Sequence, residues 1–137
     1  MPTETLDASP VPSESIEQTR LFQWVRMQQG RWPELRLLYH IPNGGSRHRL
    51  EAIHLKQQGV RAGVPDLCLP VARAGCHGLY VEMKRLKGGR VSPEQLAWME
   101  ALQAEGYMVA VCQGWEMASD VILRYLKGRD GHGQTSA

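Results

Sequence analysis

Two acids and a lysine stand within one mostly apolar stretch, GVPDLCLPVARAGCHGLYVEMK, at residues 63–84. Asp66 directly follows a proline, and Glu82 and Lys84 stand two positions apart. Burying a charged side chain costs free energy unless the charge is paired or binds a metal. Carboxylate oxygens are ligands that Mg²⁺ prefers, and a nearby ammonium group can orient an attacking water or stabilise charge on a phosphate. The three residues together therefore suit metal-dependent hydrolysis of a phosphodiester.

An ion pair without catalytic function is the competing interpretation. For an isolated Glu-x-Lys spacing, a salt bridge between Lys84 and either Glu82 or Asp66 is the commoner outcome. The Pro-Asp step upstream makes the catalytic interpretation considerably stronger, because it falls on a predicted neighbouring strand.

Two apolar runs, residues 66–70 and 79–84, predict the strands of an antiparallel hairpin centred near Ala74. In that register Asp66 lies directly opposite Glu82, and directly opposed residues share a face of the sheet. Because strand side chains alternate between faces, the lysine two positions after Glu82 points the same way. The hairpin is therefore expected to gather all three charged groups on one patch.

The rest of the sequence predicts a layered α/β domain. Helices are expected at residues 14–29, 47–58, 93–105 and 115–127, a strand or buried extended segment at 35–41, and a buried strand at 107–112. Ser13 and Ser92 are the expected N-caps of the first and third helices. Glycines are expected just after the C-terminal ends of the helices, and Gly128 is expected to end the last helix.

The first helix is expected to bring an acid to its apolar side. Leu21, Phe22 and Val25 form an apolar stripe, which continues back at helical spacing through Gln18 to Glu14. The stripe thus carries a carboxylate at its start.

The third helix, in VSPEQLAWMEALQAEG, has the clearest signals. Ser92 with Gln95 forms a capping box, and a proline occupies the first turn. Leu96, Met99 and Leu102 are expected to form its buried side.

Length and composition favour one cytoplasmic domain. The chain has 137 residues, of which about 13–127 are expected to form the domain, with loose tails at 1–12 and 128–137. Its 16 Lys and Arg against 14 Asp and Glu give a net charge too small to imply a polyanion partner by itself. The 3 cysteines show no CxxC spacing, which is typical of a reducing compartment, and neither a membrane span nor a signal peptide is expected.

The distribution of cations is more informative than the total. Two clusters rich in Lys and Arg flank the charged trio and are candidate DNA-backbone contacts, although solvated surface explains such runs about equally well. Their members are Arg47, Arg49, Lys56 and Arg61, then Arg85, Lys87 and Arg90. The loop Asn43-Gly44-Gly45 could bring backbone N–H groups to a phosphate, or it could be a plain tight turn.

Several motifs together resemble one known family. Pro65-Asp66 followed by Glu82-Met83-Lys84 resembles the PD-(D/E)xK nuclease superfamily, and the surrounding sequence resembles its VRR-NUC branch. The matching pieces are Glu14 with Gln18, IPNGG at 41–45, LKQQGVRAGVPDL at 55–67, LYVEMK at 79–84, and then SPEQ and GYMVAVC. The resemblance implies a restriction-endonuclease-like α/β fold, with a mixed central β-sheet flanked by α-helices, and a size like that of stand-alone phage or prophage members.

The resemblance also implies roles for individual residues. Asp66 and Glu82 would be metal ligands together with the main-chain carbonyl of Met83. Lys84 would be the catalytic lysine. Gln95 matches a family glutamine that would support the site or touch DNA.

A first-helix glutamate completes the acidic cluster in this family. Glu14 is the better match and would be the further metal ligand, ahead of Glu17. A capping-turn role for Glu14 beside Ser13, favoured by the helix dipole, is the alternative.

Three tryptophans, Trp24, Trp98 and Trp115, fall in predicted helices. Tryptophans at such positions are most often core or interface anchors, which is the role expected here.

The resulting expectation is a DNA endonuclease that depends on Mg²⁺ or Mn²⁺ and acts on DNA shape. Stand-alone members of the family resemble four-way (Holliday) junction resolvases in phage replication or repair, and cutting two symmetric strands calls for a homodimer. A nuclease for flaps, single strands or duplex DNA is the first alternative. The second is a DNA-binding protein with a vestigial site.

Overall fold

The computed structural model describes residues 10–42 and 49–136, and within these the side chains up to Gly128 except that of Arg49. Its elements, in chain order, are α2 (Glu14–Gln28), the 3-10 helix η1 (Pro33–Leu37), β1 (Tyr39–His40), α3 (Arg49–Gln57), β2 (Leu67–Leu69), β3 (Leu79–Lys84), α4 (Pro93–Ala104), β4 (Met108–Gln113) and α5 (Trp115–Ser136). No helix in these described ranges is long and apolar enough to cross a membrane.

The four strands form one mixed sheet in the order β1-β2-β3-β4. The first two pairings are antiparallel, and β4 lies parallel to β3. The parallel pair is connected through α4, as a crossover connection requires. A mixed sheet flanked by helices is the architecture that the sequence predicted.

The hairpin has the predicted register. Cys68 lies opposite Tyr80, and Leu67 lies opposite Val81. β2 is shorter than predicted and begins one residue after Asp66, so that the aspartate lies where the chain enters the strand.

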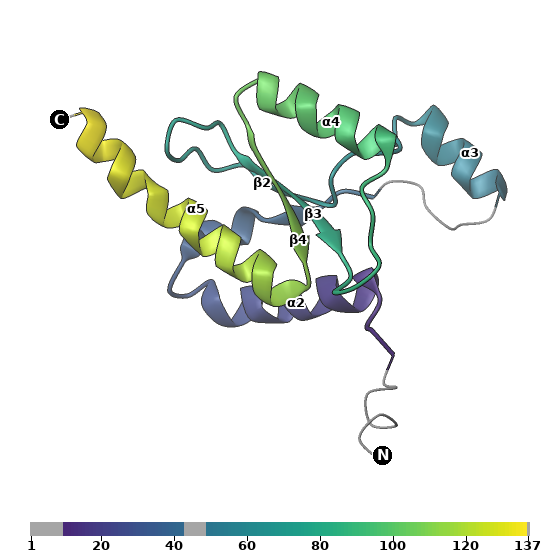
Figure 1. The fold of residues 1–137 in the computed structure, drawn as a ribbon, viewed down its shortest axis with the longest axis horizontal. Coiled ribbons are helices and arrows are strands. Elements are labelled where there is room, and N and C mark those ends of the chain that lie inside the picture. The colour runs from purple at the N-terminus through teal and green to yellow at the C-terminus, as the bar shows by residue number, and fades with distance from the viewer. Residues whose placement is uncertain (1–9, 43–48, 137) are drawn as a thin grey trace, which may run out of the picture.

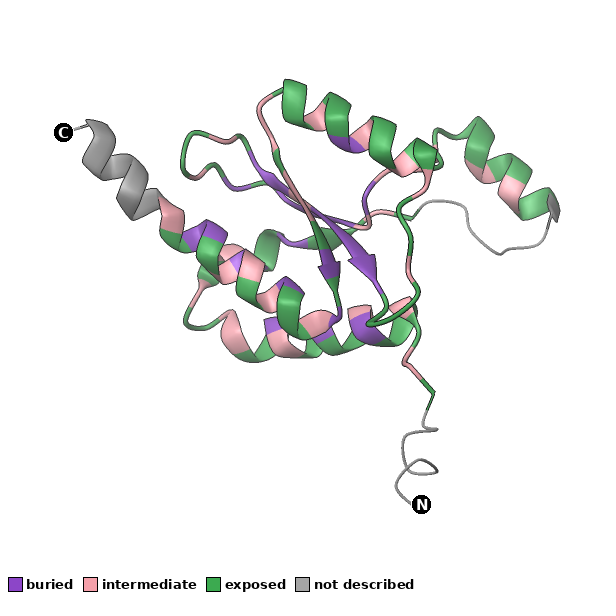
Figure 2. Ribbon diagram, in the orientation of Figure 1, coloured by how far each residue is buried: buried purple, intermediate pink, exposed green. Residues whose placement is uncertain are grey.

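The helices cover the sheet on both faces. Figure 1 shows α2 and α5 packed together on one face and α4 on the other. Alternate residues of β3, Leu79, Val81 and Met83, join the main core with side chains of α2 and α5. The opposite side chains of β3, including Glu82 and Lys84, therefore face α4. Figure 2 shows β3 buried along nearly its whole length, as expected for a strand covered on both faces.

In α2, the N-cap prediction is confirmed and the predicted stripe is partly wrong. The Ser13 side chain accepts a hydrogen bond from the backbone of Ile16. Leu21 and Val25 are buried, but the stripe continues back to Glu17 rather than to Glu14. Residues four apart lie above one another on a helix, and Val25, Leu21 and Glu17 follow that spacing.

The start of α4 is also as predicted, with a complete capping box between Ser92 and Gln95. The predicted buried side is wrong in part, because Met99 is buried but Leu96 is 51% exposed and Leu102 only half-buried. The strand that follows was expected to be buried, yet Cys112 is its only buried residue within the described chain. β4 is an edge strand, and an edge strand has neighbours on one side only.

Three predicted boundaries differ in the structure. The segment predicted as a strand at 35–41 instead contains the end of η1 and then the two-residue β1. The second helix ends at Gln57, one residue before its predicted end, and Gly59 adopts the left-handed conformation expected after a helix end. Its predicted start at Arg47 lies outside the described residues. The last helix does not end at Gly128, because the helical backbone continues to Ser136.

Candidate active site

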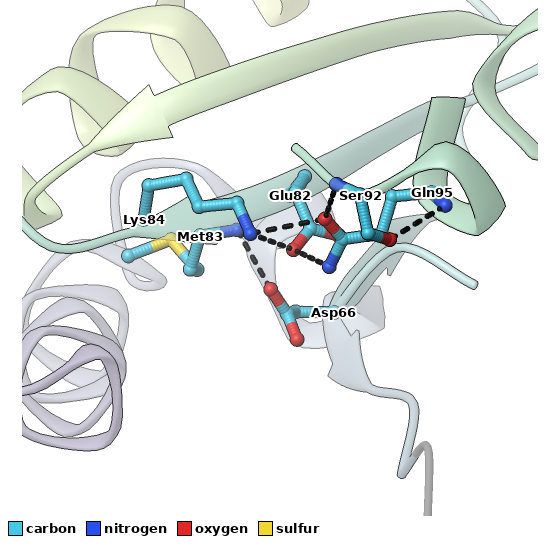
Figure 3. Close-up of polar contacts among 6 residues, drawn as sticks. All are labelled: Asp66, Glu82, Met83, Lys84, Ser92 and Gln95. Atoms are coloured by element: carbon cyan, nitrogen blue, oxygen red, sulfur yellow. Dashed lines mark hydrogen bonds and ion pairs between the residues drawn. The ribbon is translucent and has the colours of Figure 1, made fainter. Parts of the chain in front are cut away.

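Three elements bring four polar side chains together in the space between the sheet and α4 (Figure 3). Glu82 and Lys84 come from β3, Asp66 from the entry to β2, and Gln95 from the first turn of α4. The sequence predicted the first three on one face and Gln95 as a supporting residue. The structure joins Glu82, Lys84 and Gln95 directly, and Asp66 lies beside them and bonds to the backbone of Met83, which stands between Glu82 and Lys84 in β3.

Gln95 is the centre of the network. Its Nε2 donates a hydrogen bond to Glu82 Oε2 at 2.8 Å, and its Oε1 accepts one from Lys84 Nζ at 3.0 Å. The same Oε1 accepts the backbone N–H of Ser92 at 2.9 Å, which is half of the capping box. The cap that starts α4 therefore also fixes the orientation of the amide toward β3.

Asp66 is fixed through both its side chain and its backbone. Its Oδ2 accepts the backbone N–H of Met83 at 2.7 Å. Its main-chain oxygen accepts the N–H of Ile41 at 2.7 Å and lies 3.1 Å from His40 Nδ1. The histidine was not predicted at the site. His40 lies near Asp66 because β1 pairs with β2. A strand of two residues is too short to be recognised from the sequence pattern.

The charges at the centre are buried. Glu82 is 1% exposed and Lys84 is 6% exposed, and their charged atoms are 3.4 Å apart. Burial, followed by the charge of Asp66, raises the pKa of Glu82 to about 8, although Lys84 opposes this shift. Burial also raises the pKa of Asp66, against the opposing effect of the Met83 N–H. Two adjacent acids with raised pKa values form a site at which the binding of a positive charge is favourable.

A divalent cation fits this site. In the described part of the chain, Glu82 Oε1 is buried and has no hydrogen-bond partner, although buried carboxylate oxygens normally have one. Asp66 and Glu82 are hard oxygen ligands, and Mg²⁺ commonly takes one or two carboxylates and keeps several waters. They are the residues that would hold the ion, and the carbonyl of Met83 stays a predicted third ligand.

The predicted fourth member, Glu14, is not brought into a metal-binding group. Among residues 10–42 and 49–136, no three His, Cys, Asp or Glu side chains gather closely enough to hold a metal. Glu14 is half-buried in the first turn of α2. Glu17, the alternative, is 2% exposed, and its Oε1 accepts the N–H of Trp115 at 2.9 Å. Glu17 thus places its carboxylate at the N-terminus of α5, where a negative charge is favourable.

The predicted DNA contacts are described only in part. Lys56 and Arg61 are exposed near the end of α3, and Arg85, Lys87 and Arg90 are exposed in the loop between β3 and α4. The other predicted contacts, Asn43, Gly44 and Arg47 with the side chain of Arg49, lie outside the described residues.

The fold and the site together define a nuclease of the PD-(D/E)xK type: a mixed sheet in which β3 presents Glu82 and Lys84 and the entry to the adjacent β2 presents Asp66. The sequence model of the VRR-NUC domain matches residues 7–116. A solved structure described as a VRR_NUC domain protein is similar over 86% of this chain and 91% of its own, with 32% identity and a TM-score of 0.72. The chain belongs to the VRR-NUC family, which confirms the resemblance inferred from the motifs and the restriction-endonuclease-like fold.

Membership makes the chain a nuclease domain, in a family whose enzymes generally depend on a divalent metal. No curated protein sequence matches the chain significantly.

Proposed function

We propose that this protein is a metal-dependent, structure-selective DNA endonuclease. The observation that carries the proposal is the polar cluster of Asp66, Glu82, Lys84 and Gln95, in which Glu82 and Lys84 are buried and one oxygen of Glu82 has no hydrogen-bond partner in the described part of the chain. A vestigial site would not need to keep two acids beside a buried lysine, since replacing such a charged set as a whole by well-packed apolar residues is often neutral or stabilising.

Each side chain has a distinct task in phosphodiester hydrolysis. When bound, Mg²⁺ or Mn²⁺ would lower the pKa of a bound water and offset charge on the phosphate. Asp66 and Glu82 hold that ion. Lys84 donates hydrogen bonds, either to the attacking water or to a phosphate oxygen that gains charge. Gln95 holds Glu82 and Lys84 in fixed positions and is a positioning residue.

We further propose that the substrate is branched DNA, with a four-way junction as the leading candidate, and that the enzyme acts as a homodimer in phage replication or repair. Family resemblance supports this, together with the need for two active sites to cut two symmetric strands. The exposed cations that flank the site residues in the sequence, Lys56 and Arg61 and then Arg85 and Lys87, suit contacts with the DNA backbone. The free thiols of the cysteines suit a bacterial cytoplasm, whether of a bacterium or of a phage host.

A panel of labelled DNAs tests activity and substrate together. Duplex, single strand, flap, fork and four-way junction are each incubated with Mg²⁺ or Mn²⁺. The wild-type enzyme should cut the junction fastest, and Lys84→Ala should cut none of them. Lys127→Ala is the matched control, because it removes an exposed lysine from α5. Faster cutting of another DNA would replace the proposed substrate, and cleavage by Lys84→Ala would overturn the assigned role of the lysine.

A further inference from the structure

A polar cavity lies where the end of α3 and the following loop meet α4. Its volume is about 430 Å³, within the range of roughly 300–1,000 Å³ that is typical of sites for small ligands. It is lined by Lys56, Gly59, Val60, Arg61, Ala62 and Trp98.

The lining has the chemistry of a nucleotide site. Lys56 and Arg61 are exposed cations, and no carboxylate is among the described residues that line the cavity. Trp98 is half-buried, and its side chain lines the cavity. Aromatic rings stack on unpaired bases of any sequence, and cations bind the phosphates that connect them.

The cavity is attached to the active site through α4. Trp98 follows Gln95 by three residues, and side chains at that helical spacing are neighbours, with Cβ atoms about 5–6 Å apart. The loop after α3, which forms the other wall of the cavity, packs closely on the first turn of α4. A Cβ atom added at Gly63 in this loop would lie only 2.8 Å from the backbone of Glu94. That loop then continues directly into Asp66.

We propose that this cavity binds an unpaired nucleotide of the DNA substrate, with its base stacked on Trp98 and its phosphate held by Lys56 and Arg61. The inference rests on the proposed function and deepens it. A base inside a duplex is already stacked and paired and reaches such a pocket only after it is extruded, which costs a few kcal/mol. A nucleotide in a bulge or flap is already unpaired and does not bear that cost, and one at the branch point of an open junction bears less of it, because it lacks a stacked neighbour on one side. The cavity therefore gives a physical reason for preferring DNA that contains unpaired nucleotides near the cleaved bond.

Binding measured without cleavage tests this inference. Fluorescence anisotropy in EDTA compares a duplex with the same duplex carrying a short unpaired bulge. Trp98→Ala should weaken binding to the bulged DNA by roughly 5- to 100-fold, the usual effect of losing a base-aromatic stack, and leave binding to the plain duplex nearly unchanged. Trp98→Phe, which keeps an aromatic ring, should retain most of the preference.

A second variant keeps the test valid if Trp98→Ala fails to fold. Lys56→Ala changes an exposed residue and should weaken binding to the bulged DNA more than Lys127→Ala does. Equal losses for both DNAs in Trp98→Ala, or no loss for either, would overturn the inference.

The two proposals fail separately. If the wild-type enzyme cuts no DNA but prefers bulged DNA through Trp98, only the proposed nuclease function is wrong. If it cuts DNA and Trp98→Ala keeps the full preference for the bulge, only the nucleotide site is wrong.

Discussion

The side-chain amide of Gln95 accepts a hydrogen bond from Lys84 Nζ at 3.0 Å while its carbonyl oxygen also closes the capping box of α4. The helix start and Lys84, the proposed catalytic lysine, are therefore tied to one atom. Since Gln95 also donates to Glu82, a single residue determines the positions of two active-site side chains.

Gln95→Glu separates these tasks. Glutamate at this helix position preserves a capping box, so the melting temperature should change little. A carboxylate cannot donate to Glu82, so cleavage should fall by roughly 10- to 100-fold, as is common when a residue supporting a metal ligand is lost. Gln103→Glu, at an exposed position on the same helix, is the control and should leave cleavage unchanged. Equal activity in the two variants would remove Gln95 from the site.

The raised pKa of Glu82 predicts how stability varies with pH in the metal-free protein. The folded state keeps a proton on this acid up to about pH 8, whereas the unfolded state releases it near 4.5. Stability from this group is therefore complete below pH 4.5 and is lost as the pH rises toward 8. Melting temperatures in EDTA should fall over that range, and Glu82→Gln should flatten the decline. Added Mn²⁺ should restore stability near pH 8, because the ion binds the ionised carboxylates of the folded state. A decline that Glu82→Gln leaves unchanged would show that another group causes it.

The two glutamates of α2 should have separable effects. Glu17→Ala removes the buried acceptor of the Trp115 N–H and should lower the free energy of unfolding by roughly 1–3 kcal/mol in urea titrations. Glu14→Ala should leave stability nearly unchanged, and the family resemblance predicts that it lowers cleavage. Normal cleavage by Glu14→Ala would show that the site works with Asp66 and Glu82 as its only carboxylates.

Gly63 should be intolerant of a side chain. Its φ is +92°, and an added Cβ would meet the backbone of Glu94, so Gly63→Ala should both destabilise the fold and displace the turn that carries Gln95. Gly75→Ala is a matched control, because that φ is +81° but nothing lies within 4 Å of the new atom. Both variants should lose stability, and only Gly63→Ala should also lose cleavage. Equal cleavage in the two would contradict the coupling between this loop and the site.

Much of the site could be predicted from sequence because local rules determine it. The hairpin register follows from strand alternation and the turn position, and it correctly placed Cys68 opposite Tyr80. The capping box at Ser92 follows from residue types at fixed spacing. Its Gln95 then lies beside Glu82 because α4 covers that face of the sheet.

The features that were predicted wrongly or missed have a common physical origin. Each depends on strand order or on packing between segments that are distant in the sequence. Leu96 was predicted on the buried side of α4 but is 51% exposed, because burial depends on which part of the helix the sheet covers. Glu17 is buried because it binds the start of α5, far away in sequence. His40 reaches Asp66 only because β1 pairs with β2. None of these neighbours can be inferred from residue spacing along the chain.

The most direct test of the central claim is cleavage of a labelled four-way junction by Asp66→Asn with Mg²⁺ or Mn²⁺ present. Asparagine keeps the size of the side chain and an oxygen that can accept the Met83 N–H, so the melting temperature should stay near that of the wild type. Cleavage should disappear with both metals, because one of the two carboxylates that hold the ion is gone. Metal-dependent cleavage by a folded Asp66→Asn protein at the wild-type rate would contradict the account.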